Sequence, residues 1–432
     1  MMLEWYVTLA IGLSVLVALF MLGIPIFVAF IIINATGLLI YFGSASAGMF
    51  TSSIVETLVN PALLSIPMFQ LMGEVLFRSG AIDRLYHGIN QLIVRSRIRL
   101  YILSISIASC IGAVSGSALA DAAMLSKSVY PGMIQRGYDR RMSIGLILGG
   151  ATLAPIIPPS IHAVLLATIA NISVGKLLAA GIGPGLLIAF VFYLYVKVRV
   201  ALNPALAPAG DADGEASAGV GNPLLAILPF ACIFLLIMGL INFGIATPDE
   251  ASAVGALGSL LVAWRLRTLT WRLLWQALSG TARTCCMLFM IIASASLFAQ
   301  LLAFTGATRG MVGVLTNLQM SQWVVYFFMH LMGFIACMFM GPLEFMLIAI
   351  PVYNPIIDAF HWNPIWFYSL LLVNLVTGGL TPPFGMTAYV FHASTKEPLQ
   401  DVFRAALPIV AVIVVCLVIL TVFPGLVLFF VR

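Results

Sequence analysis

The stretch GGATLAPIIPPS at residues 149–160 interrupts a long apolar run, and GGLTPPFG at residues 378–385 interrupts a second one. Both stretches are rich in glycine and proline, which destabilise a helix because glycine is flexible and proline lacks an amide hydrogen. Backbone that leaves the helix inside a membrane is tolerated only where protein buries it or where it lines a cavity. Two such interruptions, at corresponding places in two halves of a chain, are typical of the binding site of a transporter.

The two stretches recur at a constant offset. The proline pair that begins at Pro158 is matched by the pair at Pro382, since 382 − 158 = 224, and Pro131 is matched by Pro355, since 355 − 131 = 224. Three prolines at one offset, with glycine-rich and apolar residues around them, indicate an internal repeat. We therefore predict a first repeat over residues 1–200, a linker over residues 201–222 and a second repeat over residues 223–432.

The composition is that of a membrane protein. Of the 432 residues, 62% are hydrophobic and 8% are charged, whereas soluble domains contain about 25% charged residues. The apolar runs are long and continuous, as in helical spans of about 20 residues, and they lack the alternation of a β-barrel. The net charge of +5 comes from basic residues sorted into loops, which is a topology signal rather than a sign of nucleic-acid binding.

No catalytic arrangement is evident in the sequence. The six cysteines lie in apolar stretches without CxxC or metal-binding spacing, and we predict that they pack as small apolar side chains. No Ser-His-Asp, metal-histidine or phosphate-loop pattern occurs, so we expect a protein that is not an enzyme and has no cofactor besides a coupling ion. The first apolar segment lacks a basic leader and a cleavage site, and we interpret it as a retained span.

Apolar segments with glycine-rich centres predict two helical hairpins, at residues 101–130 and 324–357, beside broken helices at residues 142–170 and 366–391. Arginines flank the first hairpin on both sides, which predicts a re-entrant hairpin that enters and leaves on the cytoplasmic face. Basic residues likewise assign the linker to the cytoplasm, and counting back assigns the N-terminus to the periplasm. The second hairpin is then expected to open to the periplasm, so that the two repeats have inverted topology.

Several other segments are assigned from composition. Residues 43–53 are small and polar, and we predict that they form a loop. Residues 268–283 are amphipathic and are predicted to be separate from a membrane span at residues 285–304. Glu74 and Arg283 lie close to apolar runs and are assigned interfacial or pairing roles. Asp121 is expected to support an ion site, to cap a helix or to pair with a cation of the scaffold, because a charge at that depth is costly.

With both hairpins and both broken helices in view, the sequence resembles the large membrane subunit of tripartite ATP-independent periplasmic (TRAP) transporters. The resemblance rests on IPMFQLMGEVL (66–76), SGSALADAAML (115–125), GGATLAPIIPPS (149–160) and GGLTPPFG (378–385). It implies an all-helical, elevator-type transporter in the bacterial inner membrane. It also implies sodium-driven import of an organic acid, such as a dicarboxylate, a sialic acid or a sugar acid. A separate small membrane subunit and a periplasmic substrate-binding protein are the expected partners.

Sodium prefers oxygen ligands, and unwound helices supply carbonyl oxygens without buried charge. We predict one sodium site between the first hairpin tip and the first break, and a second between the second tip and the second break. Many relatives carry an aspartate at the second tip, where this chain reads MGPLE at residues 340–344. The predicted sodium-binding residues are Ser115, Gly116, Ser117, Ile157, Pro158, Met340, Gly341, Glu344, Gly379, Thr381 and Pro382.

The organic acid is expected between the two tips, where the N-termini of half-helices offer amide donors to a carboxylate. Its predicted contacts are Ser160, His162, Gly385 and Thr387, and neither interrupting motif contains an arginine. Three alternatives stay open. The glycines and prolines could kink helices for packing alone. The chain could also be a stand-alone ion-coupled dicarboxylate carrier of related fold, or a membrane scaffold or channel subunit that transports nothing.

Overall fold

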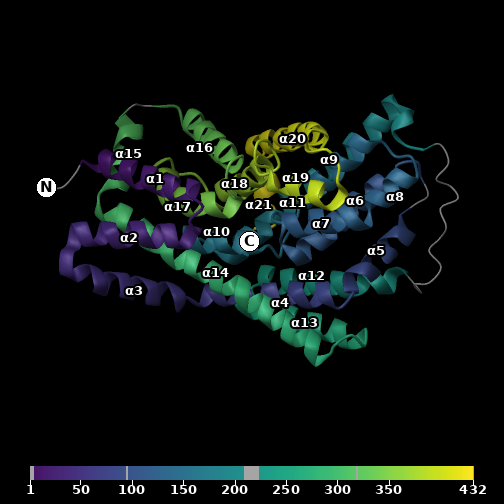
Figure 1. Cartoon of the computed structure of the whole chain (residues 1–432), viewed down its shortest axis with the longest axis horizontal. Helices are drawn as coiled ribbons and strands as arrows, with labels where there is room; N and C mark the ends of the chain where they lie inside the picture. The colour runs from purple at the N-terminus through teal and green to yellow at the C-terminus, as the bar shows by residue number, and fades with distance from the viewer. Residues whose placement is uncertain (1–3, 94–95, 209–222, 318–319, 432) are drawn as a thin grey trace.

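The computed structural model describes residues 4–93, 96–208, 223–317 and 320–431, except for the side chains of residues 21, 113–115 and 315–317. These residues form helices and turns, and none of them forms a strand. Figure 1 shows the helices packed into one elongated body. The all-helical fold class predicted from the long apolar runs is therefore confirmed.

Five helical segments among the described residues are long and apolar enough to cross a membrane. They are α2 with α3 (Ile26–Phe42 and Ser46–Leu58), α11 (Val174–Leu202), α12 (Pro223–Asn242), α14 (Trp271–Phe304) and α20 (Leu399–Val422). The other helices outside the predicted hairpins and breaks are α1 (Trp5–Met21), α4 (Ser65–Arg78), α5 (Ala81–Leu92), α13 (Pro248–Arg265), α15 (Ala307–Asn317) and the short α21 (Gly425–Leu428).

Helices are interrupted at both glycine- and proline-rich stretches. The first interruption separates α9 (Arg140–Ala151) from α10 (Ile161–Ala170), and the second separates α18 (Pro364–Gly378) from α19 (Met386–Thr395). The peptide bonds Pro158–Pro159 and Pro382–Pro383 are both cis. We call the intervening residues 152–160 the first break and residues 379–385 the second break.

Each predicted hairpin consists of two helices that contact each other across a short turn. The first contains α6 (Arg99–Ser115) and α7 (Ala118–Ser128), which is followed by α8 (Tyr130–Gln135). The second contains α16 (Gln322–Cys337) and α17 (Pro342–Ala359). We call residues 116–117 the first tip and residues 338–341 the second tip.

The starts of corresponding helices follow the offset found in the sequence. For α17 and α7 the difference between the two starting positions is 342 − 118 = 224, and for α18 and α9 it is 364 − 140 = 224. For α20 and α11 the difference is 399 − 174 = 225, which is nearly the same. The order of hairpin, broken helix and long helix is thus the same in both halves of the chain.

The prediction of a loop at residues 43–53 is wrong. A single 3₁₀ turn, Gly43–Ala45, leads directly into α3 at Ser46. The helix satisfies the hydroxyls of its small polar residues internally, since Thr51 Oγ1 donates to Ala47 O (2.9 Å) and Ser52 Oγ donates to Gly48 O (2.6 Å).

The predicted separation of residues 268–283 from the span at 285–304 is also wrong, because both belong to α14, a helix of 34 residues. No proline lies between them and Gly280 stays helical. At 1.5 Å per residue the helix is about 50 Å long, which exceeds the roughly 30 Å of a hydrocarbon core. In Figure 1 it runs diagonally past α2, α3 and α4, and it contacts all three.

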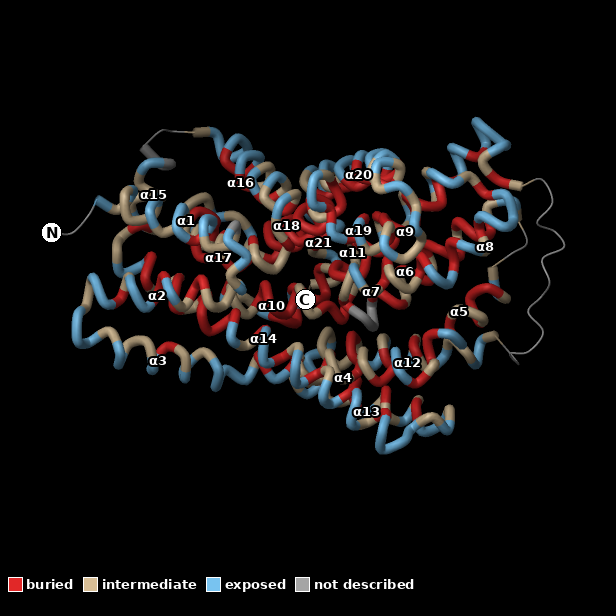
Figure 2. The backbone as a smooth tube through the Cα atoms, in the orientation of Figure 1, coloured by how far each residue is buried: buried red, intermediate tan, exposed pale blue. Residues whose placement is uncertain are grey.

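Burial is greatest where the broken helices lie (Figure 2). Every residue of α18 from Ile365 to Gly378 is buried. Helix α11 approaches the first break closely, because a Cβ atom at Gly181 would meet the Ile156 carbonyl oxygen and one at Gly185 would lie 2.5 Å from Ile157 Cγ1. The first break is therefore inside the protein, as non-helical backbone in an apolar environment requires, whereas Pro383 and Phe384 of the second break are exposed.

Candidate functional site

One cavity of about 220 Å³, which we call the central cavity, is lined by both tips and both breaks. Its lining residues are 117–119, Pro155, His162, Cys337, 340–344, Val376, Gly379, Phe384, Met386 and Thr387. Two contacts between the halves of the chain enclose it, because α7 packs against α19 and α10 packs against α17. Segments from opposite halves of the sequence therefore form a single site.

Four helices contribute residues of their first turn to the central cavity. These helices are α7, α10, α17 and α19, and each begins directly after a tip or a break. The first turn of a helix has free amide hydrogens and a partial positive charge. Among the lining residues none is lysine or arginine, so the partial positive charges that these four first turns bring to the cavity come from backbone amides.

The first tip turns at Gly116, whose φ of +59° is in the left-handed region that favours glycine. Ser117 then caps α7, since its Oγ accepts a hydrogen bond from the Ala120 amide (3.4 Å). The Gly116 carbonyl accepts from His162 Nδ1 (3.1 Å), which ties the first tip to α10. Ser115 is the last residue of α6, and its side chain lies outside the described residues.

Ser160 bridges the first break. Its hydroxyl donates to the Pro155 carbonyl (2.5 Å) and accepts from the Ala163 amide (3.2 Å), so it caps α10 and closes the non-helical segment. The side chain is fully buried and does not line the central cavity. Ile157 and Pro158 also lie outside the cavity lining, on the side of the break that faces α11.

The second break has a corresponding bridge. Thr381 Oγ1 donates to the Gly378 carbonyl (2.6 Å), and the Phe384 amide donates to the Met338 carbonyl (3.1 Å), which joins this break to the second tip. Gly385 is packed rather than open to the cavity, because a Cβ there would lie 2.9 Å from both Leu380 O and Phe403 Cε1.

Glu344 is the one carboxylate in the central cavity lining. It occupies the third position of α17, and its carboxylate folds back over Gly341, since a Cβ atom at Gly341 would overlap it. A carboxylate near the start of a helix is stabilised by the helix dipole. The geometry is therefore compatible both with capping of α17 and with binding of a cation that enters the cavity.

The structure brings most, but not all, of the predicted site residues to one place. Those that line the central cavity are Ser117, His162, Met340, Gly341, Glu344, Gly379 and Thr387. Those that do not are Gly116, Ile157, Pro158, Ser160, Thr381, Pro382 and Gly385. Sequence reasoning missed the apolar lining, including Leu119, Phe384 and Met386, because apolar side chains have no distinguishing signal in so hydrophobic a chain.

The polar side chains that line the cavity offer mainly oxygen atoms, which hard cations prefer. Within the described ranges no group of three or more His, Cys, Asp or Glu side chains could hold a metal ion. The available ligands are carbonyls at the breaks, hydroxyls and the Glu344 carboxylate. The Thr381 hydroxyl donates its proton to a carbonyl, which leaves its lone pairs free for a hard cation.

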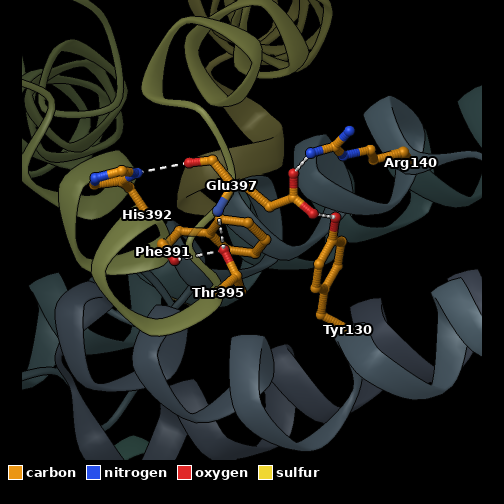
Figure 3. A network of polar contacts seen from close by, with 6 residues as sticks. All are labelled: Tyr130, Arg140, Phe391, His392, Thr395 and Glu397. Atoms are coloured by element: carbon orange, nitrogen blue, oxygen red, sulfur yellow. Dashed lines mark hydrogen bonds and ion pairs between the residues drawn. The ribbon is translucent and has the colours of Figure 1, made fainter.

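A polar network next to the site joins the two halves (Figure 3). Glu397, in the turn before α20, accepts a hydrogen bond from Tyr130 Oη (2.7 Å) and forms an ion pair with Arg140. Its carbonyl bonds to His392 Nδ1 (2.6 Å), and the Tyr130 ring packs edge-on against Phe391 with a centroid distance of 5.1 Å. Helices α8 and α9 are thus attached to α19.

An all-helical chain with several apolar helices long enough to span a bilayer, and with non-helical backbone around an internal cavity, is a multi-pass integral membrane protein. Its sequence matches the family described as "Tripartite ATP-independent periplasmic transporter, DctM component" over residues 13–426. The chain belongs to this family and is a large membrane subunit of a TRAP transporter, as its motifs indicated.

Curated relatives are permeases rather than enzymes. The chain is 32% identical over 390 residues to the C4-dicarboxylate TRAP transporter large permease of Pseudomonas aeruginosa, covering 90% of each chain. It is 26% identical over 420 residues to the ectoine large permease of Halomonas elongata, covering 96% of this chain and 97% of the relative. It is 29% identical over 381 residues to the 2,3-diketo-L-gulonate large permease of Escherichia coli, covering 87% of this chain and 88% of the relative.

A solved structure shares the fold. The crystal structure of the YdaH transporter of Alcanivorax borkumensis, described as having an unusual topology, superposes with a TM-score of 0.65. The alignment covers 89% of this chain and 90% of that one at 12% sequence identity. At this identity the likeness concerns the fold alone.

Proposed function

We propose that this permease imports an organic acid of the dicarboxylate, sialic acid or sugar acid class across the bacterial inner membrane, driven by a sodium gradient. A periplasmic substrate-binding protein delivers the acid, and a small membrane subunit completes the transporter. The observation that carries the proposal is the meeting of four helix N-termini and two helix breaks at one internal cavity.

The central cavity is suited to an anion. Each helix N-terminus contributes roughly 0.3–1 kcal/mol to a bound negative charge when exposed, and up to about 2 kcal/mol when partly buried. Four first turns around about 220 Å³ therefore stabilise a carboxylate without an arginine. Ser117 and Thr387 have hydroxyls in the lining and are the proposed hydrogen-bonding contacts, together with His162. Ser160 and Gly385 lie outside the cavity lining, and as N-cap residues they fix the positions at which α10 and α19 begin.

Two sodium ions bind beside the anion in this proposal. The first is held by oxygens of the first tip, Ser115, Gly116 and Ser117, and of the first break, including Ile157 and Pro158. The second is held by oxygens of the second tip, Met340, Gly341 and Glu344, and of the second break, Gly379, Thr381 and Pro382. Each ion sits between a tip and a break, so its binding fixes the wall of the anion site and couples sodium to substrate.

Contacts between the two halves of the chain support an elevator mechanism. The contacts of α7 with α19 and of α10 with α17, and the network around Glu397, connect both tips and both breaks into one body. We propose that this body moves against a static part that contains α4, α12 and α13. In this proposal the two halves are inverted repeats with re-entrant hairpins. The N-terminus is then periplasmic, and the linker at 201–222 is cytoplasmic.

Uptake by proteoliposomes tests the function. The chain is reconstituted with its small subunit, and the binding protein is loaded with candidates chosen from the relatives, namely a C4-dicarboxylate, ectoine and 2,3-diketo-L-gulonate. We expect uptake that requires both an inward sodium gradient and the binding protein. Uptake without the binding protein would instead favour a stand-alone carrier. Absence of uptake for every candidate that the binding protein is shown to bind would favour a non-transporting subunit.

Substitutions test the sodium sites separately. We expect Ser115→Ala and Pro382→Ala to raise the sodium concentration for half-maximal uptake with little change in expression. Ser126→Ala is the matched control, because this buried serine of α7 donates only to the Ala123 carbonyl of its own helix (2.8 Å). Unchanged sodium dependence in both site variants would reject the assignment.

A further inference from the structure

A second cavity, of about 680 Å³, lies between the first tip and helices α4 and α14. We call it the vestibule. Ser117, His162 and Leu343 line both the vestibule and the central cavity, so these three residues separate the two spaces. Helix α10, which contacts both α4 and α14, forms one wall of the vestibule through Ile161, His162 and Leu165. A ligand that leaves the central cavity past the first tip therefore enters the vestibule.

The vestibule continues into a third cavity of about 340 Å³, which we call the arginine cleft. Arg78 and Gln276 line both spaces, and Arg283 lies in the cleft. The three cavities thus follow one another from the helix breaks to the exposed faces of α4 and α14.

Charge changes along this series. The central cavity has no lysine or arginine in its lining, whereas the cleft has two arginines. Arg78 Nε donates to Glu74 Oε2 (2.7 Å), with the two side chains 36% and 22% exposed. Over the described ranges no carboxylate lies within ion-pair distance of Arg283. The Arg78–Glu74 pair is neutral and Arg283 adds a positive charge, so the cleft attracts anions.

Glu74 is held in place by the opposite helix. A Cβ atom at Gly280 of α14 would lie 3.1 Å from Glu74 Cδ, so this glycine lets α14 pack directly on the carboxylate. Arg78, by contrast, is at the end of α4 and half-exposed. Arg78 is therefore the more exposed and less packed partner of the pair.

We propose that the vestibule and arginine cleft form a second anion-binding station, in which Arg78 exchanges Glu74 for the oxyanion of a ligand and Arg283 supplies the second charge. The inference rests on the proposed transport function, since the ligand is the carboxylate of the transported acid as it leaves the central cavity. Guanidinium groups bind carboxylates and phosphates in the same bidentate manner, so a phospholipid headgroup shares this chemistry.

Inhibition by inorganic sulfate tests the station. Proteoliposomes of phosphatidylcholine receive sulfate on either face during sodium-driven uptake, against chloride at equal sodium and ionic strength. We expect sulfate to inhibit from one face only. Loss of one charge-assisted hydrogen bond in R78Q or R283Q is expected to raise the sulfate concentration for half-inhibition about tenfold. The control R272Q changes an arginine of the same helix, α14, outside the three cavities, and is expected to match the wild type.

The variant E74Q makes the test specific. Removal of the competing carboxylate frees Arg78 and is expected to lower the sulfate concentration for half-inhibition, opposite in sign to R78Q. A purely structural pair would move both variants in the same direction, and that result would overturn the proposal. Unchanged sulfate sensitivity in both R78Q and R283Q would also overturn it, and R78K, which keeps the charge, shows whether a loss in R78Q reflects misfolding.

A lipid arm distinguishes the two ligands. If sulfate inhibition is kept when phosphatidylglycerol is added to the vesicles, the station is open to the transported acid, as proposed. If the added lipid abolishes the inhibition, a headgroup holds the site and the assignment to the transported acid is wrong. Absence of sodium-driven uptake in the wild type would reject the proposed function instead, whereas normal uptake without any sulfate effect rejects only this inference.

Discussion

Ser160→Ala removes the bridge across the first break. The Ser160 hydroxyl donates to the Pro155 carbonyl and accepts from the Ala163 amide, and the side chain is fully buried. Loss of an N-cap side chain costs about 1 kcal/mol. Pro155 is buried, and its carbonyl, left without the Ser160 hydroxyl, adds about 1–3 kcal/mol. We therefore expect the free energy of unfolding to fall by about 2–4 kcal/mol.

The measurement is equilibrium unfolding in mixed micelles with increasing sodium dodecyl sulfate, followed by the fluorescence of the seven tryptophans. Thr168→Val is the matched control, since Thr168 Oγ1 donates to the Val164 carbonyl (2.8 Å), which also accepts a bond within helix α10. This control is expected to change the free energy of unfolding by less than about 1 kcal/mol. A Ser160→Ala variant as stable as the control would refute the claim that the hydroxyl holds the break.

Three other predictions concern the network, the packing and the site. A double-mutant cycle of Tyr130→Phe and Glu397→Ala should give a coupling of about 1–2 kcal/mol in the same unfolding assay, because Glu397 is only 14% exposed and bonds directly to Tyr130; additive effects would contradict the bond. Gly112→Ala should destabilise by about 1–3 kcal/mol, since its Cβ would lie 2.6 Å from Ala154 Cα. Gly132→Ala, with no atom within 4 Å, should instead stabilise by up to about 1 kcal/mol, and equal effects would show that packing does not matter there. Thr387→Val should raise the KM for uptake about three- to tenfold by removing a hydroxyl from the central cavity, and an unchanged KM would exclude Thr387 from the substrate site.

The sequence is most informative where the backbone has to leave the helix. The proline pairs at 158 and 382 locate both breaks, because a membrane helix cannot absorb two prolines in succession without losing amide hydrogens. The glycines are less informative. Gly112 and Gly116 both lie in the glycine-rich centre of the first hairpin, yet Gly112 is inside α6 and gives room to Ala154, whereas the turn itself is at Gly116.

Side-chain roles can be predicted only in part. The sequence predicts that a hydroxyl at the edge of a break faces the substrate, yet the Ser160 hydroxyl is used by the helix that begins there. Thr387 follows the second break in the same way and does line the cavity. The two cases differ by the local geometry of each break, which depends on packing against α11 in one half and on the contact with Phe403 in the other.

The close approach of α11 to the first break limits how this region can diverge among related permeases. At Gly181 the first carbon of any side chain would overlap the Ile156 carbonyl, and at Gly185 it would press on Ile157. In a saturation-mutagenesis library selected for growth on the imported nutrient, we expect both codons to retain glycine almost alone. Rare survivors with alanine are expected at Gly185, together with a smaller side chain at Ile157, because the obstacle at Gly181 is a backbone carbonyl that no substitution at Ile156 removes.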